Sequence, residues 1–261
     1  MTEIKLIEKE EIPTAIQTPT GVILPIGRDL TVSKSPSRML IYSSPKAGKT
    51  TLVAGLDDCL LLDLEKGSGF VAAMRYSCNN TTDIYNFVQA VKSRGVKYKY
   101  LAVDTVTALE AMCIPLAKTI YLNTPQGKNF KGENVLHLPD GGGYIFLRNA
   151  MEMMLGMLQD SCERLILLGH LKDKFLSAKA GVEVSTKDLD LTGKLRNIAC
   201  ANADAIGYLY RKGQDTILSF KTSDEVLCGA RPAHLKNKEL VMATEQPNGE
   251  IVTYWQKIFI D

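Results

Sequence analysis

A short run of residues early in the chain has the types and spacing of a loop that binds phosphate groups. Its backbone N–H groups can cradle phosphates, Lys49 can reach the β and γ phosphates of a nucleoside triphosphate, and the Thr50 hydroxyl can bind Mg²⁺. The usual pattern begins with glycine, whereas this chain has Ser43, which adopts positive φ less freely. We therefore predict a site for ATP and Mg²⁺. Its cofactor-binding residues are Ser44, Pro45, Lys46, Ala47, Gly48, Lys49, Thr50 and Thr51.

Acidic side chains end two further apolar segments that have the composition of strands. Asp104 ends one of them and is placed to hold the metal together with Thr50. Asp63 and Glu65 end the other, and strand alternation directs both to one side. We assign Glu65 as the base that orients and deprotonates an attacking water, with Asp63 as its structural partner. The alternatives are a helix cap for Asp104 and a surface ion pair for Glu65.

A histidine follows a fourth apolar segment, Leu165–Leu168. His170 shares its strand-end position with Asp104 and Glu65, so it is placed to face the γ phosphate and to sense the nucleotide state. A lone histidine with a purely structural role is the alternative. Lys49, Glu65 and His170 are therefore the candidate catalytic residues.

Elements that alternate between strand and helix must position these side chains. This alternation predicts an α/β fold with a mostly parallel central sheet in three α/β/α layers. The expected strands are Arg38–Tyr42, Cys59–Leu64, Tyr100–Val103, Arg164–Leu168, Ala205–Tyr210 and Thr216–Phe220. The expected helices are Lys49–Gly55, Thr82–Ser93, Thr107–Tyr121 and Tyr144–Cys162.

Composition supports a globular intracellular protein. The chain has 261 residues, of which 45% are hydrophobic and 23% charged, with a net charge of +2. We expect no membrane partner and no secretory signal, and we place the protein in the cytoplasm. The six cysteines are widely spaced, which indicates reduced and mostly buried thiols.

Prolines and glycines interrupt the first part of the chain. We expect residues 1–37 to form an extended arm or an edge hairpin, and residues 38–261 to form the core domain. Two stretches inside the core, 123–143 and 172–193, lack clear periodicity. Structureless loops of this length inside a compact domain usually have a function or move.

Together these motifs resemble those of the RecA-like recombinase ATPases. The resemblance covers about residues 38 to 232 and rests on Ser-Pro-Lys-Ala-Gly-Lys-Thr-Thr, Leu-Asp-Leu-Glu, Ala-Val-Asp-Thr-Val-Thr-Ala-Leu and Leu-Leu-Gly-His. The segment from Ile206 to Gly213 is also similar to the Arg-Lys-Gly hairpin strand of the eukaryotic and archaeal recombinases. The chain looks most like core-only phage nucleotide-binding proteins of the AAA family, including Sak-type single-strand-annealing ATPases. The resemblance implies a RecA-like P-loop fold, with Glu65 as the catalytic glutamate and His170 as the polar sensor.

Members of this group place two DNA-binding loops after the third and fourth core strands, which correspond here to residues 123–143 and 172–193. Lysines neutralise phosphates and aromatic rings stack on bases, so both stretches are suited to a single strand. Acidic residues are interspersed, and a solvated surface segment is the alternative for each. The candidate nucleic-acid-binding residues are Lys128, Phe130, Lys131, Lys172, Lys174, Phe175 and Lys179.

Members of the group also assemble head to tail, so that a neighbour supplies a cation to the nucleotide. The resemblance therefore implies a homo-oligomer, either a ring or a filament, with Arg211 and Lys212 as the cations that act in trans. An Arg-Lys pair that is merely solvated is the alternative. The resemblance further implies a single-stranded-DNA-binding protein as a partner and a bacterial or phage-infected cell as the setting.

These observations predict a Mg²⁺-dependent ATPase that binds single-stranded DNA and promotes annealing or strand pairing. Three alternatives stay open. A ring helicase or loader ATPase would use the same site to move along nucleic acid. A small-molecule phosphotransferase would use the long loops as a lid, although Glu65 argues against it because a water-activating base would waste nucleotide. A nucleotide-gated scaffold would bind ATP and scarcely hydrolyse it.

Overall fold

The computed structural model describes residues 15–17, 21, 23–25, 33–177, 183–223 and 225–260, and for 15–17, 23–25, 173–177 and 183–185 it describes the backbone alone. The chain divides into two units, Met1–Ser33 and Lys34–Asp261. This division falls after Ser33, whereas the sequence placed the boundary after residue 37. In the first unit, β1 (Ala15–Gln17) pairs antiparallel with β2 (Ile23–Pro25).

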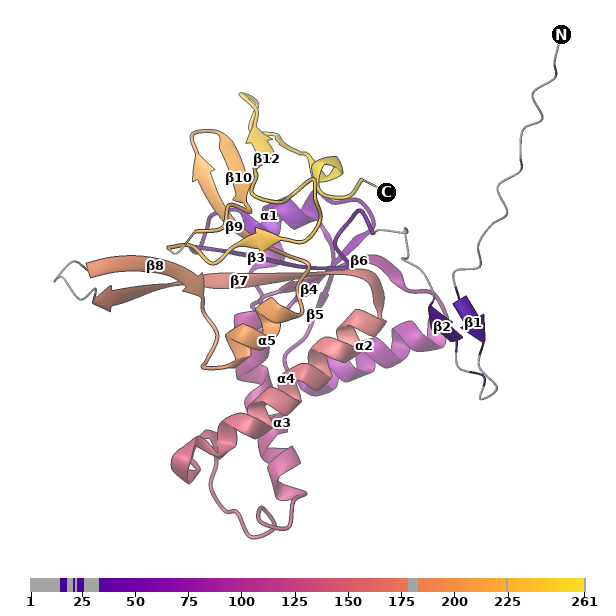
Figure 1. Ribbon diagram of the computed structural model, residues 1–261, viewed down its shortest axis with the longest axis vertical. Helices are drawn as coiled ribbons and strands as arrows, with labels where there is room; N and C mark the ends of the chain where they lie inside the picture. The colour runs from indigo at the N-terminus through magenta and orange to yellow at the C-terminus, as the bar shows by residue number, and fades with distance from the viewer. Residues whose placement is uncertain are drawn as a thin grey trace. The chain divides into compact units, whose positions relative to one another are not determined.

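The second unit is built on a sheet whose central strands are parallel (Figure 1). The order of these strands is β9-β3-β7-β6-β4-β5, and each pairs in parallel with its neighbour. Their bounds are β3 Arg38–Ser43, β4 Cys59–Asp63, β5 Met74–Ser77, β6 Tyr98–Asp104, β7 Cys162–Ser177 and β9 Ala205–Lys212.

Antiparallel strands extend this sheet beyond β9. The strand β10 (Asp215–Ser219) pairs with β9, and β12 (Glu239–Glu245) and β13 (Ile251–Thr253) follow outward. The short strand β11 (Gly229–Ala230) pairs with the start of β9. The sequence did not predict β5, β11, β12 or β13, because these strands are short or irregular in pattern.

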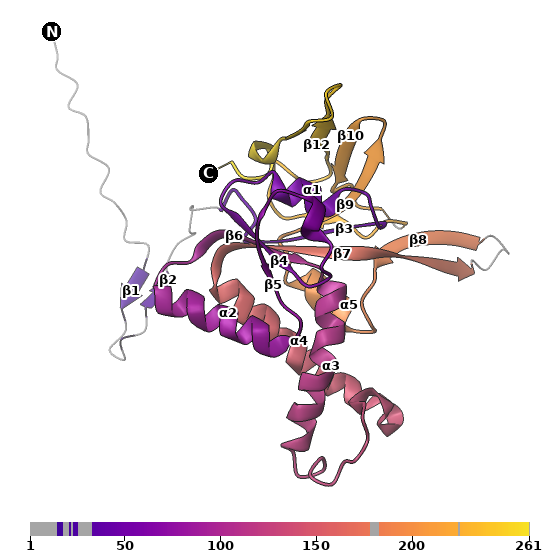
Figure 2. The ribbon, with the colours of Figure 1, turned by 180° about the vertical axis from the view of Figure 1, so that it is seen from behind.

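Helices cover both faces of the sheet, because successive side chains along each strand point to opposite faces and form two apolar clusters. Along β3, Leu40 and Tyr42 join one core cluster, whereas Met39 and Ile41 join the other. The first cluster packs against α2 (Thr81–Arg94), α3 (Val106–Leu122), α4 (Gly143–Asp160) and α5 (Leu195–Ala201). The second packs against α1 (Lys49–Ala54) and the 3₁₀ helix Trp255–Lys257. In both views α1 lies above the central strands and α2 to α4 lie below them (Figures 1 and 2).

Local signals fix both ends of α2 and the start of α3. The Asn80 side chain accepts a hydrogen bond from the Asp83 N–H at the start of α2, and Gly95 ends that helix at φ 73°. Thr105 caps α3 in the same way by accepting from the Ala108 N–H. Every strand and helix that the sequence predicted is present, which confirms the three-layer α/β/α architecture with a mostly parallel sheet.

The expectation of a structureless loop over residues 172–193 is wrong. Strand β7 continues through Ser177, and β8 (Glu183–Leu189) returns antiparallel to it, so the two form a hairpin. Figure 1 shows this hairpin extending past the helices that cover the core. Because no helix covers it there, its sequence does not need the continuous apolar run by which we located the other strands.

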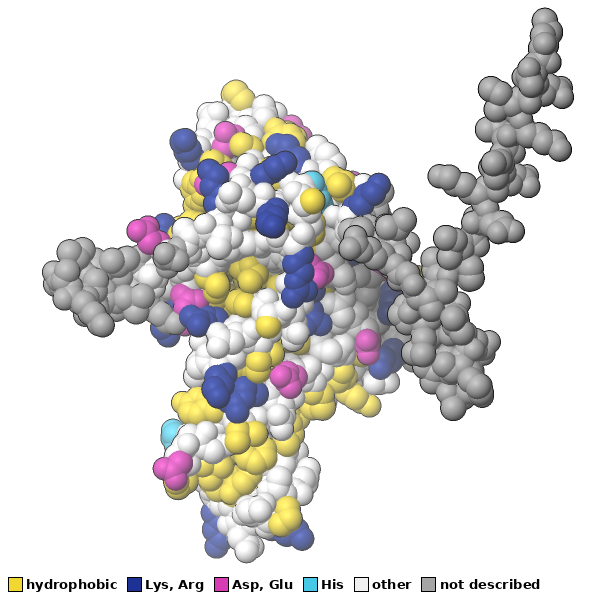
Figure 3. Space-filling model, in the orientation of Figure 1, with side chains coloured by type: hydrophobic (Ala, Val, Ile, Leu, Met, Phe, Trp, Pro, Cys, Tyr) yellow, Lys and Arg dark blue, Asp and Glu magenta, His cyan; other side chains and the backbone are white. Residues whose placement is uncertain are grey.

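The other long stretch, residues 123–142, joins α3 to α4 through turns and two 3₁₀ helices, Val135–His137 and Pro139–Gly141. Figure 3 shows hydrophobic side chains gathered over this part of the molecule. Three exposed ones lie on α4: Tyr144, Ile145 and Met153. No helix within the described residues is long and apolar enough to cross a membrane.

Candidate functional site

Candidate functional side chains from four parallel strands lie at one edge of the sheet. The register pairs Ser43 of β3 with His170 of β7, and Asp63 of β4 with Asp104 of β6. Since parallel strands end on the same side, the carboxyl ends of β3, β4 and β6 meet next to the middle of β7. Ligands of open α/β sheets bind at this edge, in the crevice where strand order reverses.

The loop between β3 and α1 is open to solvent on its outer side. Ser43 is buried in extended strand backbone, so the serine at the first position of the loop requires no positive φ. Gly48 adopts φ 99° at the N-cap of α1 and provides no side-chain acceptor for the first N–H groups of that helix. Ser44, Pro45 and Lys46 are exposed. The backbone of this loop is therefore accessible to an anion.

Lys49 lies at the bottom of the loop with 6% of its surface exposed. Its Nζ donates to the Ser43 Oγ at 3.1 Å and to the Ser44 carbonyl at 3.4 Å. Burial lowers the pKa of this ammonium, while the nearby carboxylates of Asp104 and Glu65 oppose the shift. A phosphate at this loop would stabilise the buried charge.

Thr50 and Asp104 meet across the edge. The Thr50 hydroxyl donates to the Asp104 Oδ2 at 2.6 Å, and Asp104 is only 5% exposed. Burial raises the pKa of this carboxyl in spite of the Thr50 hydrogen bond. A cation would relieve that cost, and a hydroxyl with a carboxylate is a donor set suited to Mg²⁺.

Glu65 lies just after β4, where it contacts two side chains from other elements. The Thr105 hydroxyl donates to its Oε1, and the Nε2 of His170 lies 2.9 Å from the same oxygen. The other ring nitrogen of His170, Nδ1, is buried, with no hydrogen-bond partner among the described residues. The structure thus brings together residues 65, 105 and 170, which are remote in the sequence, around one carboxylate.

Asp63 has a different environment. Its carboxylate accepts hydrogen bonds from the backbone N–H groups of Glu65, Gly67 and Ser68, and from the Ser68 hydroxyl. Burial alone would raise the pKa of Asp63, but these donors hold it below its ordinary value. Asp63 therefore organises the turn that carries Glu65, and its own lone pairs face the turn.

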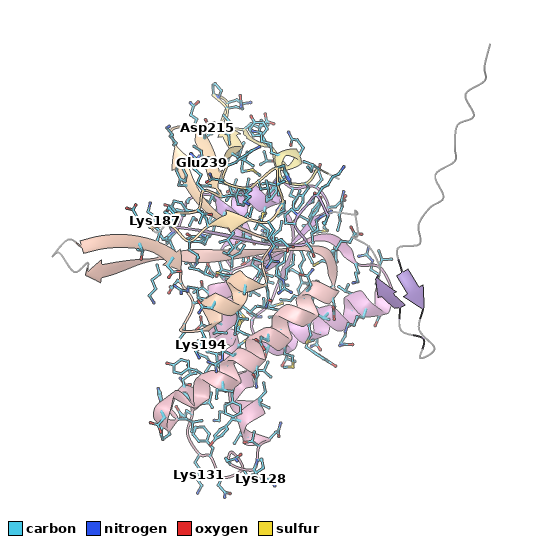
Figure 4. All side chains as sticks on the ribbon, in the orientation of Figure 1. Lys128, Lys131, Lys187, Lys194, Asp215 and Glu239 are labelled. Atoms are coloured by element: carbon cyan, nitrogen blue, oxygen red, sulfur yellow. The ribbon has the colours of Figure 1, made fainter. Side chains whose placement is uncertain are left out.

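The candidate residues of the α3–α4 connection lie far from this edge. Lys128 and Lys131 are exposed at the tip of the connection, well separated from Lys187 of β8 (Figure 4). Phe130 packs edge-on against Tyr121, with ring centroids 5.3 Å apart. The ring thus already has a partner from α3 and is half-buried.

The candidates of the second stretch belong to the β7–β8 hairpin. Lys172 is exposed and pairs with Asp190 at 3.2 Å. Lys174 and Phe175 lie on β7, where the backbone alone is described, and Lys179 lies outside the described residues. The structure therefore does not bring the two candidate nucleic-acid segments together.

Arg211 and Lys212 end β9 and are both exposed. The Arg211 Nη2 pairs with the Glu245 Oε2 of β12 at 2.8 Å. This pair is open to solvent on both sides, so it holds Arg211 only weakly.

The six cysteines are free and show no sign of reactivity. Burial raises the pKa of four of them to about 12 and that of the other two, Cys200 and Cys228, to about 11, so all six thiols stay protonated. Across the part of the chain that the structure describes, no group of three or more His, Cys, Asp or Glu side chains could hold a metal ion by itself. A divalent cation here would thus need further ligands, such as nucleotide phosphates or water.

Sequence reasoning missed two side chains of this site. Thr105 contacts Glu65, and its signal was available, because a threonine between a strand-end aspartate and a helix is a typical N-cap. The Ser43 hydroxyl contacts Lys49, but the sequence showed this position only as a departure from glycine.

Comparison with known proteins shows the family to which the chain belongs. No curated protein matches the sequence. Among solved structures, the chain is similar to the RadB recombinase, with 11% identity over 84% of this chain and 92% of that one, and a TM-score of 0.44. A family model described as an AAA domain matches residues 35–249. This model covers more than half of the chain, which therefore belongs to the AAA domain family.

Proposed function

We propose that this protein is a Mg²⁺-dependent ATPase of the RecA-like class that binds single-stranded DNA and promotes annealing or strand pairing. The observation that carries the proposal is the placement of Glu65 with His170, 2.9 Å apart, at the edge where Lys49, Thr50 and Asp104 also lie. This edge combines a candidate phosphate-binding loop with a carboxylate that solvent reaches.

The residues at the edge fit ATP and Mg²⁺. Gly48, at φ 99°, and the exposed backbone before it leave room for phosphates, and the buried Lys49 ammonium lacks a carboxylate within hydrogen-bond distance among the described residues. Thr50 and Asp104 would hold the cation. Bound there, ATP with Mg²⁺ would supply a phosphoryl group whose transfer to water is strongly favourable.

Glu65 is suited to act as the general base. It is 35% exposed on its side chain, so water reaches it, and Thr105 and His170 fix its orientation. A base in this position takes a proton from the attacking water and contributes about 10²- to 10⁴-fold to the rate. Lys49 neutralises negative charge on the phosphates during this step.

The strand that carries His170 also supports a link to nucleic acid. β7 continues without a break from His170 into the β7–β8 hairpin, whose lysines are suited to phosphates. A movement of His170 that follows the state of Glu65 would thus reach the hairpin along one strand. The exposed Lys128 and Lys131 would provide a second contact to the same strand of DNA.

We also infer a homo-oligomer in which the exposed end of β9 faces the nucleotide of a neighbouring subunit. Arg211 would exchange its solvent-exposed partner Glu245 for a phosphate, and Lys212 lies next to it. The RecA-like resemblance adds a single-stranded-DNA-binding protein to the partners.

Phosphate release from ATP, with and without single-stranded DNA at low and moderate salt, tests the proposal. We expect stimulation by DNA that weakens as salt rises. Complementary oligonucleotides should then anneal faster, while a forked duplex stays paired. Hydrolysis that ignores DNA would overturn the nucleic-acid part, and unwinding of the fork would replace annealing with a helicase function.

A further inference from the structure

A pocket lies beside the base of the β7–β8 hairpin, on the opposite face of the sheet from α1. Its volume is about 370 Å³. Tyr208 packs against the core cluster that α2 to α5 cover, whereas α1 packs against the other cluster, so the pocket is separate from the phosphate-binding loop. The residues that line it are Lys187, Tyr208, Tyr210, Ser219, Lys221, Ser223, Val226 and Glu239.

Two tyrosines form the floor of this pocket. Tyr208 and Tyr210 are two residues apart on β9, so their rings share one face, with centroids 5.6 Å apart and planes inclined by 21°. Both rings are only half-buried. A ladder of parallel, partly exposed rings offers a planar π system a surface on which to stack.

Two lysines, Lys187 and Lys221, line the sides of the pocket. The Nζ of Lys187 lies 4.7 Å from the centroid of the Tyr208 ring, and Lys221 pairs with Glu239 at 2.6 Å. Glu239 also accepts a hydrogen bond from the Tyr210 hydroxyl at 3.0 Å. Because Glu239 neutralises one of the two lysines, Lys187 is the cation best placed to meet an incoming anion.

Hydrogen bonds hold the backbone of Lys187 in place beside the pocket. The Lys187 N–H donates to the Glu225 carbonyl at 2.7 Å, and its carbonyl accepts from the Leu227 N–H at 3.1 Å. Tyr42, which lies beside Tyr208, donates from its hydroxyl to the same carbonyl at 3.4 Å. These bonds hold the backbone of Lys187 close to Tyr208.

We propose that this pocket binds one nucleobase together with its phosphate. The base stacks on Tyr210, the ring that Lys187 does not cover, and the phosphate pairs with Lys187. The volume suits a single base with its phosphate. By contrast, the cavity of about 650 Å³ between α4 and α5 has no aromatic ring among its described lining residues, so it offers a base nothing to stack on. The unit is either one residue of a single strand or a free nucleotide, and in the first case the inference rests on the proposed function.

The test measures binding of a fluorescein-labelled oligothymidylate to the full chain by fluorescence anisotropy. Tyr210→Leu keeps apolar volume but removes the ring, so it should weaken binding about five- to hundredfold. Tyr210→Phe is the matched control, because it keeps the ring and loses only the hydrogen bond to Glu239; it should bind as the unaltered chain does. Lys187→Gln should lower the slope of log K against log salt by about one.

Equal binding by Tyr210→Leu and the unaltered chain would overturn the pocket and leave the proposed function standing. Equal weakening in Tyr210→Leu and Tyr210→Phe would overturn stacking. If the unaltered chain binds no oligothymidylate, the nucleic-acid function fails. In that case AMP titrated into Lys49→Ala decides: binding that Tyr210→Leu abolishes supports a free-nucleotide pocket, and its absence overturns the pocket as well.

Discussion

The edge that carries Lys49 and Glu65 and the two lysine-bearing segments differ in how tightly their side chains are held. At the edge, Thr50 and Asp104 lie 2.6 Å apart, and Glu65 contacts two partners from other elements. In the two segments, Lys128 and Lys131 are exposed and Lys172 has one solvated partner. Chemistry on one phosphoryl group requires fixed geometry, whereas binding a flexible polymer needs charge that can adapt. We therefore expect large effects from changes at the edge and small ones in the segments.

The largest effect is expected at Lys49. Lys49→Ala removes the buried ammonium at the phosphate loop, so ATP hydrolysis should fall by more than about 10³-fold and most nucleotide binding should be lost. Phosphate release and titration with a fluorescent nucleotide measure both quantities. Lys92→Ala is the control, because Lys92 is an exposed lysine on α2. Hydrolysis at the normal rate in Lys49→Ala would show that this edge of the sheet is not the site of ATP hydrolysis.

Glu65→Gln should separate binding from turnover. The amide still accepts from Thr105 but cannot take a proton, so turnover should drop by about 10²-fold or more while ATP binding persists. Single-turnover kinetics measures the rate of hydrolysis, and nucleotide titration measures the affinity for ATP. Glu163→Gln, an exposed glutamate at the other end of β7, should change neither. Unchanged turnover in Glu65→Gln would move the role of base to another residue.

The double variant with Lys128→Gln and Lys131→Gln tests the exposed lysines of the α3–α4 connection, whose charge we expect to adapt to a flexible strand. Each lysine that no longer neutralises a phosphate should lower the slope of log K against log salt by about one, and affinity for single-stranded DNA should fall several-fold. Salt-dependent anisotropy measures this, with Lys92→Gln and Lys97→Gln as the exposed control pair. A loss as large as that of turnover in Glu65→Gln would show that the tip is as tightly organised as the edge.

The smallest effect concerns stability and pH. Because burial raises the pKa of Asp104 in the folded state, folding favours the protonated carboxyl, and the ionised form costs stability as pH rises through that pKa. Asp104→Asn removes the charge and should raise the thermal midpoint of the free protein at pH 7.5 by about 2–4 °C. This gain should shrink as pH falls toward 4. Thermal scans at both pH values check it, and a gain that grows on acidification would contradict the assigned burial cost.

Much of the fold followed from the sequence because parallel buried strands are nearly continuous apolar runs. The strands that end at Asp63 and Asp104 and the strand that contains His170 were located this way. The hairpin over 172–193 was mistaken for a loop, since a strand pair that extends beyond the helix-covered core does not need a continuous apolar run. The strands β12 and β13 were missed for a related reason: they lie at the periphery of the sheet, and few of their positions are buried.

The sequence by itself determined the loop that begins at Ser43, the acids at the strand ends and the α/β alternation, because each is a local pattern whose meaning depends on neighbours along the chain. Only the tertiary structure decided that Glu65 meets His170, that Lys49 is buried, and that Tyr208 and Tyr210 share a pocket with Lys187. These contacts depend on strand order and register. Both are set by packing between segments far apart in the chain, which no local pattern encodes.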